Sequence, residues 1–458
     1  MTFEYRPSRR AVLQQALASA AVLTLAGCTG DKPAPSAPDP NNPFGVGADS
    51  VLDVAVANGH DADTKTPLEL YKKKFPQATA TVVALPQLAT ALQPRFDAGN
   101  PPDVVLNSSP DALALGNLVS SGALSDLGPL LKAPSWDQPQ RTVGDALLPG
   151  ALESGSYDGT ARAIPYVSTV YAFWYSAPLF ERRGWEVPRS WPELIRTAIT
   201  LKAKGLAPFT YAGAHPHYIL EPILTLAAKT GGHEVMVAID NLEDGAWKHP
   251  GLLAALKAFG ELSSRGLLLK SSDDLDHTAS QTRFLTGKAA FLPCGNWLEN
   301  EMAKFVPKGF GLTAMAIPPL DEVKLPNGVH VTYEQPVVLP EKAPNPAGGA
   351  EFIRAMLSAP AASAYAAATN TLTVVRGGYD NEKASTALRS AGRLLDLAGD
   401  QVVRWYFDSW YPTLAKAAAD ATGAFMVGAL TPAEWSDRLQ KAADALKSDK
   451  TIPKYRRD

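Results

Sequence analysis

Residues 51–106 alternate between short β-branched segments and apolar stripes with helical spacing. Strands are predicted over 51–57, 80–85 and 103–106, because these segments are short, rich in Val and bounded by turn-forming residues. Helices are predicted between them, over 64–75 and 88–97, where apolar residues recur every three to four positions. Strand–helix–strand order at this spacing predicts parallel strands joined by crossover helices, and hence an α/β fold.

The rest of the chain carries further helix signals. Ser190-Trp191-Pro192-Glu193 is a capping box with proline in the first turn, and Thr431-Pro432-Ala433-Glu434 repeats the pattern. The first box predicts a helix that ends at Gly205, and residues 171–175 predict an aromatic strand. Other helices are predicted over residues 110–120, 219–230, 250–265, 347–368, 383–397, 412–421 and 431–447.

The first residues have the features of an export signal that ends at a lipidation site. A start with three arginines precedes an apolar run over 16–26, which leads to Leu25-Ala26-Gly27-Cys28. The run is shorter than the about 20 apolar residues that a membrane-spanning helix needs. We expect a signal peptide over 1–27, cleavage before Cys28 and diacylglycerol on the Cys28 sulfur. A buried N-terminal helix is the competing interpretation, and residues 8–13 leave twin-arginine and general export equally open.

Residues 28–49 are predicted to form a lipidated, flexible tether. Five prolines and few apolar side chains cannot supply a hydrophobic core. The chain is therefore expected to work on the extracytoplasmic side of a cell membrane, held there by lipid. About 430 residues follow the signal peptide, which is enough for two domains.

Composition argues against several classes of protein. A formal net charge of −3 over 458 residues gives no basic stripe for nucleic acid. Cys294 is the only cysteine after Cys28, so no internal disulfide and no four-cysteine zinc site is expected. Serine elbows, HExxH pairs and glycine-rich phosphate loops are missing, and no catalytic residue, metal or cofactor is predicted. The two carboxylates of a glycosidase leave no local signal, because they pair in space.

Several aromatic residues stand beside Gly, Pro, Asn or His in loop-like settings. A pyranose has an apolar C–H face that stacks on aromatic rings and a hydroxyl rim that hydrogen-bonds polar side chains. These aromatics therefore suit a sugar cleft, with core packing as the competing interpretation, which we prefer for Trp174, Trp185 and Trp191. The candidates are Tyr166, Tyr171, Tyr211, Tyr218, Trp297, Trp405, Tyr406, Trp410 and Tyr411.

Four stretches of the sequence are distinctive. They are Gly-Asn-Pro-Pro-Asp-Val-Val at 99–105, the segment 157–184 with its Ala-Ile-Pro-Tyr, Ser-Trp-Pro-Glu-Leu at 190–194, and 284–297, which ends in Gly-Asn-Trp. Together they resemble the extracellular solute-binding lipoproteins (family 1) that serve ABC sugar importers. The resemblance implies an α/β, two-lobed, periplasmic-binding-protein-like (type II) fold with a central ligand cleft and hinge crossovers.

Longer strings narrow the resemblance to the branch that binds N-acetylglucosamine and diacetylchitobiose in actinomycete-type bacteria. These strings are residues 211–216, 245–250, 276–282, 291–301 and 372–377. One segment departs from that branch. Asn-Gly-His-Asp-Ala-Asp at 58–63 stands where a Gly/Tyr-rich loop is expected, which leaves the sugar preference open.

The resemblance also implies how the chain divides. Lobe 1 would comprise residues 50–165 plus 335–377, and lobe 2 would comprise residues 166–334 plus 378–458. Crossovers are expected near Pro165, near Glu334 and at 376–378. Ligands often bind between domains, and closure follows from better ligand contacts in the closed state.

Strand ends and matching motifs give the predicted ligand-binding residues. His60 and Asp61 follow the first strand, and Asn107 and Ser108 follow the third, where strand ends face the crevice of an open α/β sheet. For Asn107 and Ser108, a helix N-cap before Pro110 is equally open. The resemblance adds residues at the crossovers, in one loop of lobe 2 and at stacking positions, each with a structural role as the alternative. These are Tyr166, Tyr211, His215, Trp297, Glu334, Trp410 and Tyr411.

These observations predict a monomeric substrate-binding lipoprotein. It would capture N-acetylglucosamine or a chitobiose-type chito-oligosaccharide between two lobes and deliver it to ABC permease subunits without covalent chemistry. The alternatives are a binder of another oligosaccharide, a cell-surface glycosidase or lyase, and a sensor that signals to a membrane kinase.

Overall fold

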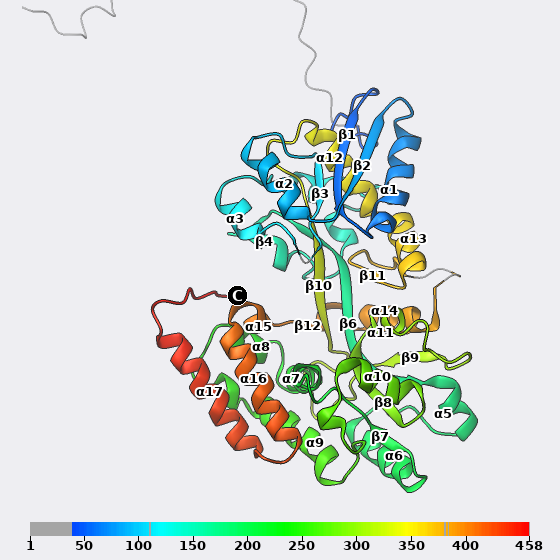
Figure 1. Ribbon diagram of the computed structural model, residues 1–458, viewed down its shortest axis with the longest axis vertical. Helices are drawn as coiled ribbons and strands as arrows, with labels where there is room; N and C mark the ends of the chain where they lie inside the picture. Colours follow the sequence, from blue (N-terminus) through cyan, green and yellow to red (C-terminus); the bar gives the residue numbers. More distant parts are fainter. Residues whose placement is uncertain (1–38, 110, 380–381, 383, 458) are drawn as a thin grey trace, which may run out of the picture. The chain divides into compact units, whose positions relative to one another are not determined.

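The computed structural model describes residues 39–109, 111–379, 382 and 384–457 (Figure 1). The predicted signal peptide and Cys28 lie outside these residues. A large mixed sheet has the strand order β2-β1-β3-β10-β6-β8-β7, and three short strands pair beside this path. The strands are β1 (Val51–Ala57), β2 (Thr79–Leu85), β3 (Val104–Leu106), β4 (Ser156–Tyr157), β5 (Thr160–Ala161), β6 (Ile164–Ser176), β7 (Ala207–Phe209), β8 (Ala289–Gly295), β9 (Leu312–Met315), β10 (Val329–Val338), β11 (Leu372–Thr373) and β12 (Val402–Val403).

The predicted strand–helix alternation at the start of the fold is confirmed. β1 pairs in parallel with both β2 and β3. The connecting helices are α1 (Asp61–Lys74) and α2 (Leu88–Asp97), as the apolar spacing indicated. The first helix begins three residues earlier than predicted. The carboxyl ends of these parallel strands therefore meet at one edge of the sheet.

Two long strands, β6 and β10, run antiparallel through the middle of the fold (Figure 1). Their register extends from His330↔Tyr171 to Val337↔Ile164. β6 has 13 residues and extends well beyond the predicted segment 171–175. Gln335 in β10 has φ of 57°, a left-handed conformation that only a few per cent of non-glycine residues adopt.

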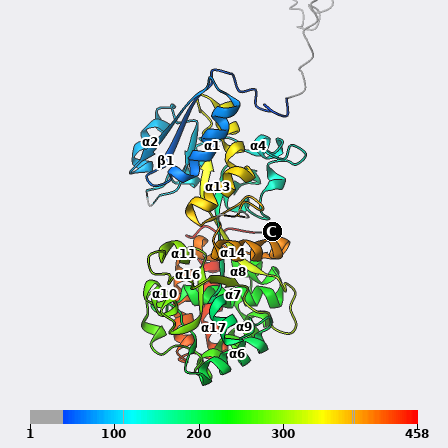
Figure 2. The same ribbon diagram turned by 90° about the vertical axis from the view of Figure 1, so that its right-hand side faces the viewer.

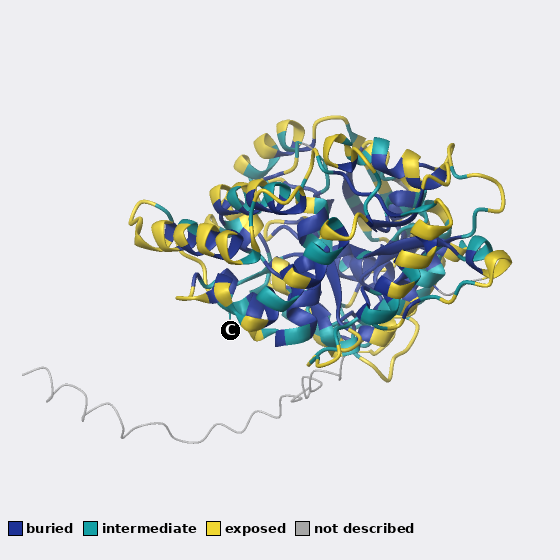
Figure 3. Ribbon diagram, turned by 90° about the horizontal axis from the view of Figure 1, so that it is seen from below, coloured by how far each residue is buried: buried dark blue, intermediate teal, exposed yellow. Residues whose placement is uncertain are grey.

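Two large apolar cores lie along these strands. One core gathers Val54, Val104 and Ile164, while the other gathers Phe173 and Phe259 with many helix residues. Because side chains alternate along a strand, Ala172 and Trp174 of β6 belong to the first core, and Phe173 and Tyr175 to the second. Figure 2 shows α1 beside β1 and α13 next to α1, while α7, α9, α16 and α17 lie together in the other half of the fold. Figure 3 shows the buried strands inside, with the exposed faces of the helices outward.

Most helix predictions are confirmed, with two corrections. The segment 347–368 divides into α12 and α13, because Ser358 caps a new helix and Pro360 has no N–H to continue the old one. In the segment 110–120, residues 111–114 are not helical and residues 115–120 form α3. The remaining helices are α3 (Leu115–Ser120), α4 (Gly128–Lys132), α5 (Ala177–Arg183), α6 (Trp191–Ala203), α7 (His217–Gly231), α8 (Glu234–Asp240), α9 (Pro250–Ser264), α10 (His277–Leu285), α11 (Leu298–Glu301), α12 (Pro346–Met356), α13 (Ala359–Thr369), α14 (Thr386–Ala398), α15 (Phe407–Trp410), α16 (Pro412–Met426) and α17 (Pro432–Ser448).

One of the two predicted capping boxes forms in full. Thr431 and Glu434 make both of its hydrogen bonds at the start of α17. At the start of α6 the Ser190 side chain accepts from the Glu193 N–H, but Oε2 of Glu193 accepts from the Arg189 N–H instead of that of Ser190. Cys294 in β8 is buried, and burial raises the pKa of its thiol. Among the described residues, no helix is both long and apolar enough to cross a membrane.

Candidate functional site

Five rings from five separate parts of the chain form a continuous contact chain, which we call the aromatic band. Tyr171 in β6 lies opposite His330 in β10, with ring centroids 4.7 Å apart, as cross-strand partners on one sheet face do. His330 stacks on Trp405 at 3.5 Å with an interplanar angle of 8°. On the other side, Tyr171 meets Trp297 edge to face at 5.3 Å. Trp297 in turn lies 6.0 Å from Tyr218, at the start of α7.

Three histidines extend the band at its Tyr218 end. His215 lies 6.0 Å from His277 and 6.1 Å from His217 between ring centroids. The Nε2 atom of His277 lies 2.6 Å from Oε1 of Glu301. Burial and the two neighbouring histidines lower the pKa of His217, which favours its neutral form. In the described part of the chain, no group of acidic, His or Cys side chains has a geometry that could hold a metal ion.

Acidic side chains lie beside the band. Burial and the charge of Asp408 raise the pKa of Glu221 in α7 well above its usual range. Burial also raises the pKa of Asp408, although its Oδ2 accepts a hydrogen bond of 3.0 Å from Nε1 of Trp405. Burial, with the charges of Glu221 and Glu334, raises the pKa of the Tyr171 hydroxyl. The band is thus flanked by groups that accept or donate hydrogen bonds.

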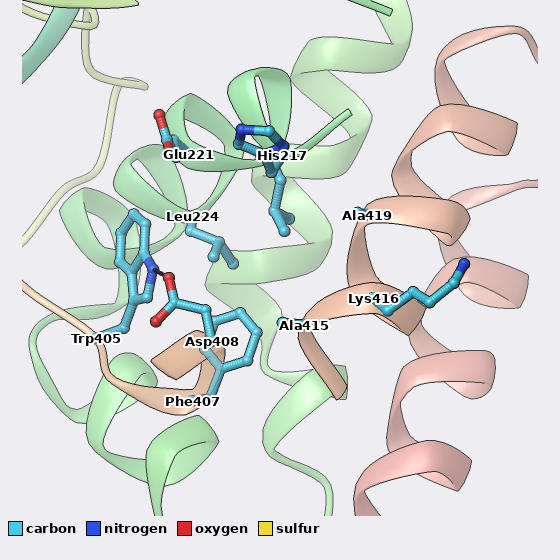
Figure 4. A pocket seen from close by; sticks show the side chains of 10 residues that line it. His217, Glu221, Leu224, Trp405, Phe407, Asp408, Ala415, Lys416 and Ala419 are labelled. Carbon is cyan, nitrogen blue, oxygen red and sulfur yellow. Dashed lines mark hydrogen bonds between the residues drawn. The ribbon is translucent and has the colours of Figure 1, made fainter. Parts of the chain in front are cut away.

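A pocket of about 350 Å³ opens between α7 and α16, and we call it the α7–α16 pocket. Trp405 belongs both to its wall and to the aromatic band. Figure 4 shows Glu221 and His217 on one side, Asp408 and Phe407 on another, and Leu224 between them. The pocket therefore combines an apolar interior with two carboxyl groups.

A second aromatic group lies near the end of the described chain. Trp410 stacks between Tyr406 and Tyr455, with ring centroids 5.4 Å from each. Arg457 places a guanidinium over the Tyr406 ring and pairs with Asp240 at 3.1 Å. Trp410 lines a wide hollow of about 920 Å³, together with Arg376 and several residues between Gly144 and Gly159. This hollow is more polar and more open than the α7–α16 pocket.

The structure brings some predicted site residues together. Trp297 lies in the band and His215 in its histidine extension. Glu334 is exposed on β10, where its Oε1 accepts from the Thr332 hydroxyl at 2.8 Å. Trp410 lies in the second aromatic group rather than in contact with the band.

The residues predicted after β1 and β3 lie elsewhere. His60 is the residue before α1, with Nδ1 2.8 Å from Oδ2 of Asp63, and Asp61 is the first residue of that helix. Asn107 is buried, donates to the Leu113 carbonyl at 2.9 Å and accepts from the Leu113 N–H at 2.8 Å. Its side chain therefore closes a loop, and it is not a helix N-cap, since α3 begins only at Leu115. Ser108 is half-buried beside it.

Three predicted tyrosines are core residues in this structure. Tyr166 is buried against Tyr365 at 5.2 Å, and its hydroxyl has no hydrogen-bond partner among the described residues. Tyr211 is buried, which raises its pKa to about 12. Tyr411 is buried too, and its hydroxyl oxygen accepts from the Tyr455 N–H at 3.0 Å. The surroundings of these three tyrosines therefore agree with the alternative interpretation, a structural role.

Glu221, Asp408, His277 and His330 were missed as site candidates. The spacing of α7 held a signal for one of them, because Glu221 lies three and four residues after Tyr218 and His217, on the same helix face. His330 carried no such signal, since its position depends on the long-range pairing of β10 with β6.

Residues 57–363 match the family described as bacterial extracellular solute-binding protein. The chain belongs to this family. It is also 30% identical to the diacetylchitobiose binding protein NgcE of Streptomyces coelicolor, over 98% of each chain. The family resemblance seen in the sequence is thus confirmed, and it places the chain among extracytoplasmic binding proteins.

Solved structures share the fold at low sequence identity. A chitin oligosaccharide binding protein matches with a TM-score of 0.60 and 19% identity, over 88% of this chain and 100% of that one. The apo form of RafE from Streptococcus pneumoniae matches with a TM-score of 0.68 and 20% identity, over 87% and 98%. A probable secreted solute-binding lipoprotein from Streptomyces coelicolor matches with a TM-score of 0.67 and 19% identity, over 86% of this chain and 98% of that one. The predicted α/β, two-lobed type II fold is therefore confirmed.

Proposed function

We propose that this chain is the substrate-binding lipoprotein of a carbohydrate ABC importer, and that it binds N-acetylglucosamine or a diacetylchitobiose-type sugar. Its kinship with NgcE along nearly the whole chain supports the sugar class. The corner formed by Trp297 and Tyr171 is the observation that carries the proposal for the site. Two rings at an interplanar angle of 81° present one ring face beside one ring edge.

This corner suits a pyranose. Half-buried Trp297 has an indole face on which the C–H face of a sugar can stack. Exposed Glu334 and the histidines beside Tyr218 supply hydrogen-bonding groups for the hydroxyl and acetamido groups at the sugar rim. We propose the band as one wall of the cleft, with residues near His60, Asp61 and Ser108 as the opposite wall.

The proposed lobes are those predicted from the sequence, 50–165 plus 335–377 and 166–334 plus 378–458. β6 and β10 run from one core to the other, so bending these strands would move the lobes. Gln335 lies at the proposed crossover in a left-handed conformation, as residues in switch regions often do. Closure around the sugar and reopening at the permease follow from hinge motion in this segment.

The proposed anchor is a lipid on Cys28. The protein would work as a monomer on the outer face of the membrane, with permease subunits as its partner. Membrane fractionation of cells that express the Cys28→Ser variant tests the anchor. We expect the variant in the soluble extracytoplasmic fraction, and membrane retention equal to wild type would contradict lipidation.

Isothermal titration of the delipidated protein with diacetylchitobiose tests the function. One-to-one binding with the sugar recovered intact is the expected result, and chromatography of the ligand after incubation checks for cleavage. Turnover of the sugar would identify a glycosidase instead. Absence of binding to every chitin fragment, together with binding of another oligosaccharide, would replace the proposed sugar class.

A further inference from the structure

The α7–α16 pocket holds two carboxyl groups that no cation neutralises. Within the described residues, neither Glu221 nor Asp408 takes part in an ion pair, and the Glu221 carboxyl group has no hydrogen-bond partner. Lys416 lines the pocket, but its Nζ pairs with Oδ2 of Asp420 at 2.7 Å and points away from the cavity (Figure 4). Glu221 is half-buried, and acidic groups withdrawn from water are normally paired, so its lack of a partner is unusual.

The apolar part of the pocket narrows the kind of ligand. Leu224, Phe407 and Ala415 line it, and the Trp405 ring forms one wall. A cavity of about 350 Å³ is at the small end of ligand pockets and is large enough for one sugar ring. A fitting ligand therefore combines a compact cation with C–H surface.

We propose that the α7–α16 pocket binds the ammonium group of an amino sugar, so that the protein takes up chito-oligosaccharides with free amines. This inference rests on the proposed function and names a subclass of its ligands. An ammonium group has three donors, which Glu221 and Asp408 accept, while the Trp405 face attracts the positive charge. The carboxyl group of Glu221 gains the counter-charge that it lacks.

The pocket adjoins the aromatic band, so that a single ligand can contact both. Trp405 touches His330 of the band, and the charge of Glu221 acts on both Tyr171 and Tyr218. We place one ring of the disaccharide at Trp297 and its other ring in the pocket. Burial raises the pKa of Glu221 and favours its neutral form, and a bound ammonium group would oppose this shift and favour the carboxylate.

Titration calorimetry at pH 6 with two disaccharides tests the inference. One is diacetylchitobiose, and the other is the β-1,4-linked dimer of glucosamine, whose amines are protonated at this pH. Wild-type protein is expected to bind the glucosamine dimer. Glu221→Gln and Asp408→Asn are each expected to weaken that binding at least tenfold more than they weaken diacetylchitobiose binding. Asn at 408 keeps an acceptor for Nε1 of Trp405, so the local hydrogen bond remains.

Glu261→Gln is the matched control, because Glu261 lies on the surface of α9 in an i,i+4 pair with Arg265. This variant is expected to leave the affinity for both disaccharides unchanged. Thermal melting shows whether each variant folds, and if one of the two pocket variants does not fold, the other still tests the inference. The inference would be overturned if the pocket variants bound both disaccharides equally more weakly, or if their affinity for the glucosamine dimer were unchanged. So would a wild-type protein that binds diacetylchitobiose and ignores the glucosamine dimer, and this result leaves the proposed function intact. Binding of neither sugar would overturn both.

Discussion

Gly295 holds the position of Trp297, and replacing it with alanine should displace that ring. A Cβ atom at residue 295 would lie 1.9 Å from Cζ3 of Trp297 and 2.4 Å from its Cη2. Carbon atoms in contact prefer about 3.5–4.0 Å, so the indole would have to move by roughly 1.5 Å or more. The backbone of Gly295 has no positive φ, so alanine fits the strand itself.

The expected effect is on sugar binding rather than on folding. A displaced indole loses the stacking geometry, which is worth about 0.5–1.5 kcal/mol beyond buried area. At about 1.4 kcal/mol for each factor of ten, the dissociation constant should rise roughly 2- to 12-fold. Trp297→Ala, which removes the whole face, should weaken binding by at least as much.

Calorimetry with diacetylchitobiose measures both variants, and thermal unfolding shows that each still folds cooperatively. Gly116→Ala is the matched control, since a Cβ there meets nothing within 4 Å and its helix accepts alanine. Gly295→Ala that binds as wild type, while Trp297→Ala also binds as wild type, would show that the sugar lies elsewhere.

Three further predictions concern stability. Burial lowers the pKa of His330 to about 3, so the native state resists protonation of this side chain. As the pH drops from about 6.5 toward 3, the free energy of unfolding should therefore fall by up to about 1.4 kcal/mol per pH unit from this group. In urea denaturation at a series of pH values, His330→Gln should reduce this pH dependence, and an unchanged pH dependence would refute the assignment. Thr431→Ala removes one half of the α17 capping box and should cost about 1 kcal/mol in denaturant unfolding while leaving sugar affinity alone, so an unshifted midpoint would argue against the cap. Arg354 is almost fully buried and pairs with Glu351 at 2.7 Å. Glu351→Ala removes this carboxylate partner and should lower the free energy of unfolding by about 3–5 kcal/mol. A decrease of under about 1 kcal/mol in denaturant unfolding would show that solvent reaches the pair.

Local sequence signals predicted the start of the fold well. β1, α1, β2 and α2 follow from apolar spacing and turn residues, and α17 follows from its capping box, because these signals act within a few residues. The parallel order of β1–β3 followed from connection length alone. The full length of β6 could not be predicted from the sequence. All but one of its residues are buried, so its apolar run shows no alternation.

The candidate site divides along the same line. Trp297 was predicted from its motif and lies in the aromatic band. Asn107 was predicted from its place after a strand, yet its amide is used by Leu113, a contact that depends on how the loop folds back. His330 joins the site through the pairing of β10 with β6, and Asp408 lines the pocket opposite α7 residues that lie nearly 190 positions earlier; contacts of this kind leave no pattern in a single chain.

The burial of Cys294 makes lobe movement directly measurable. With Cys28 replaced, Cys294 is the only thiol in the chain, and burial with a raised pKa keeps it out of reach of maleimide dyes. Two new surface cysteines, one on α2 and one on α9, could then carry a donor and an acceptor fluorophore while Cys294 stays in place. Energy transfer between the dyes would report closure, molecule by molecule, as sugar is added.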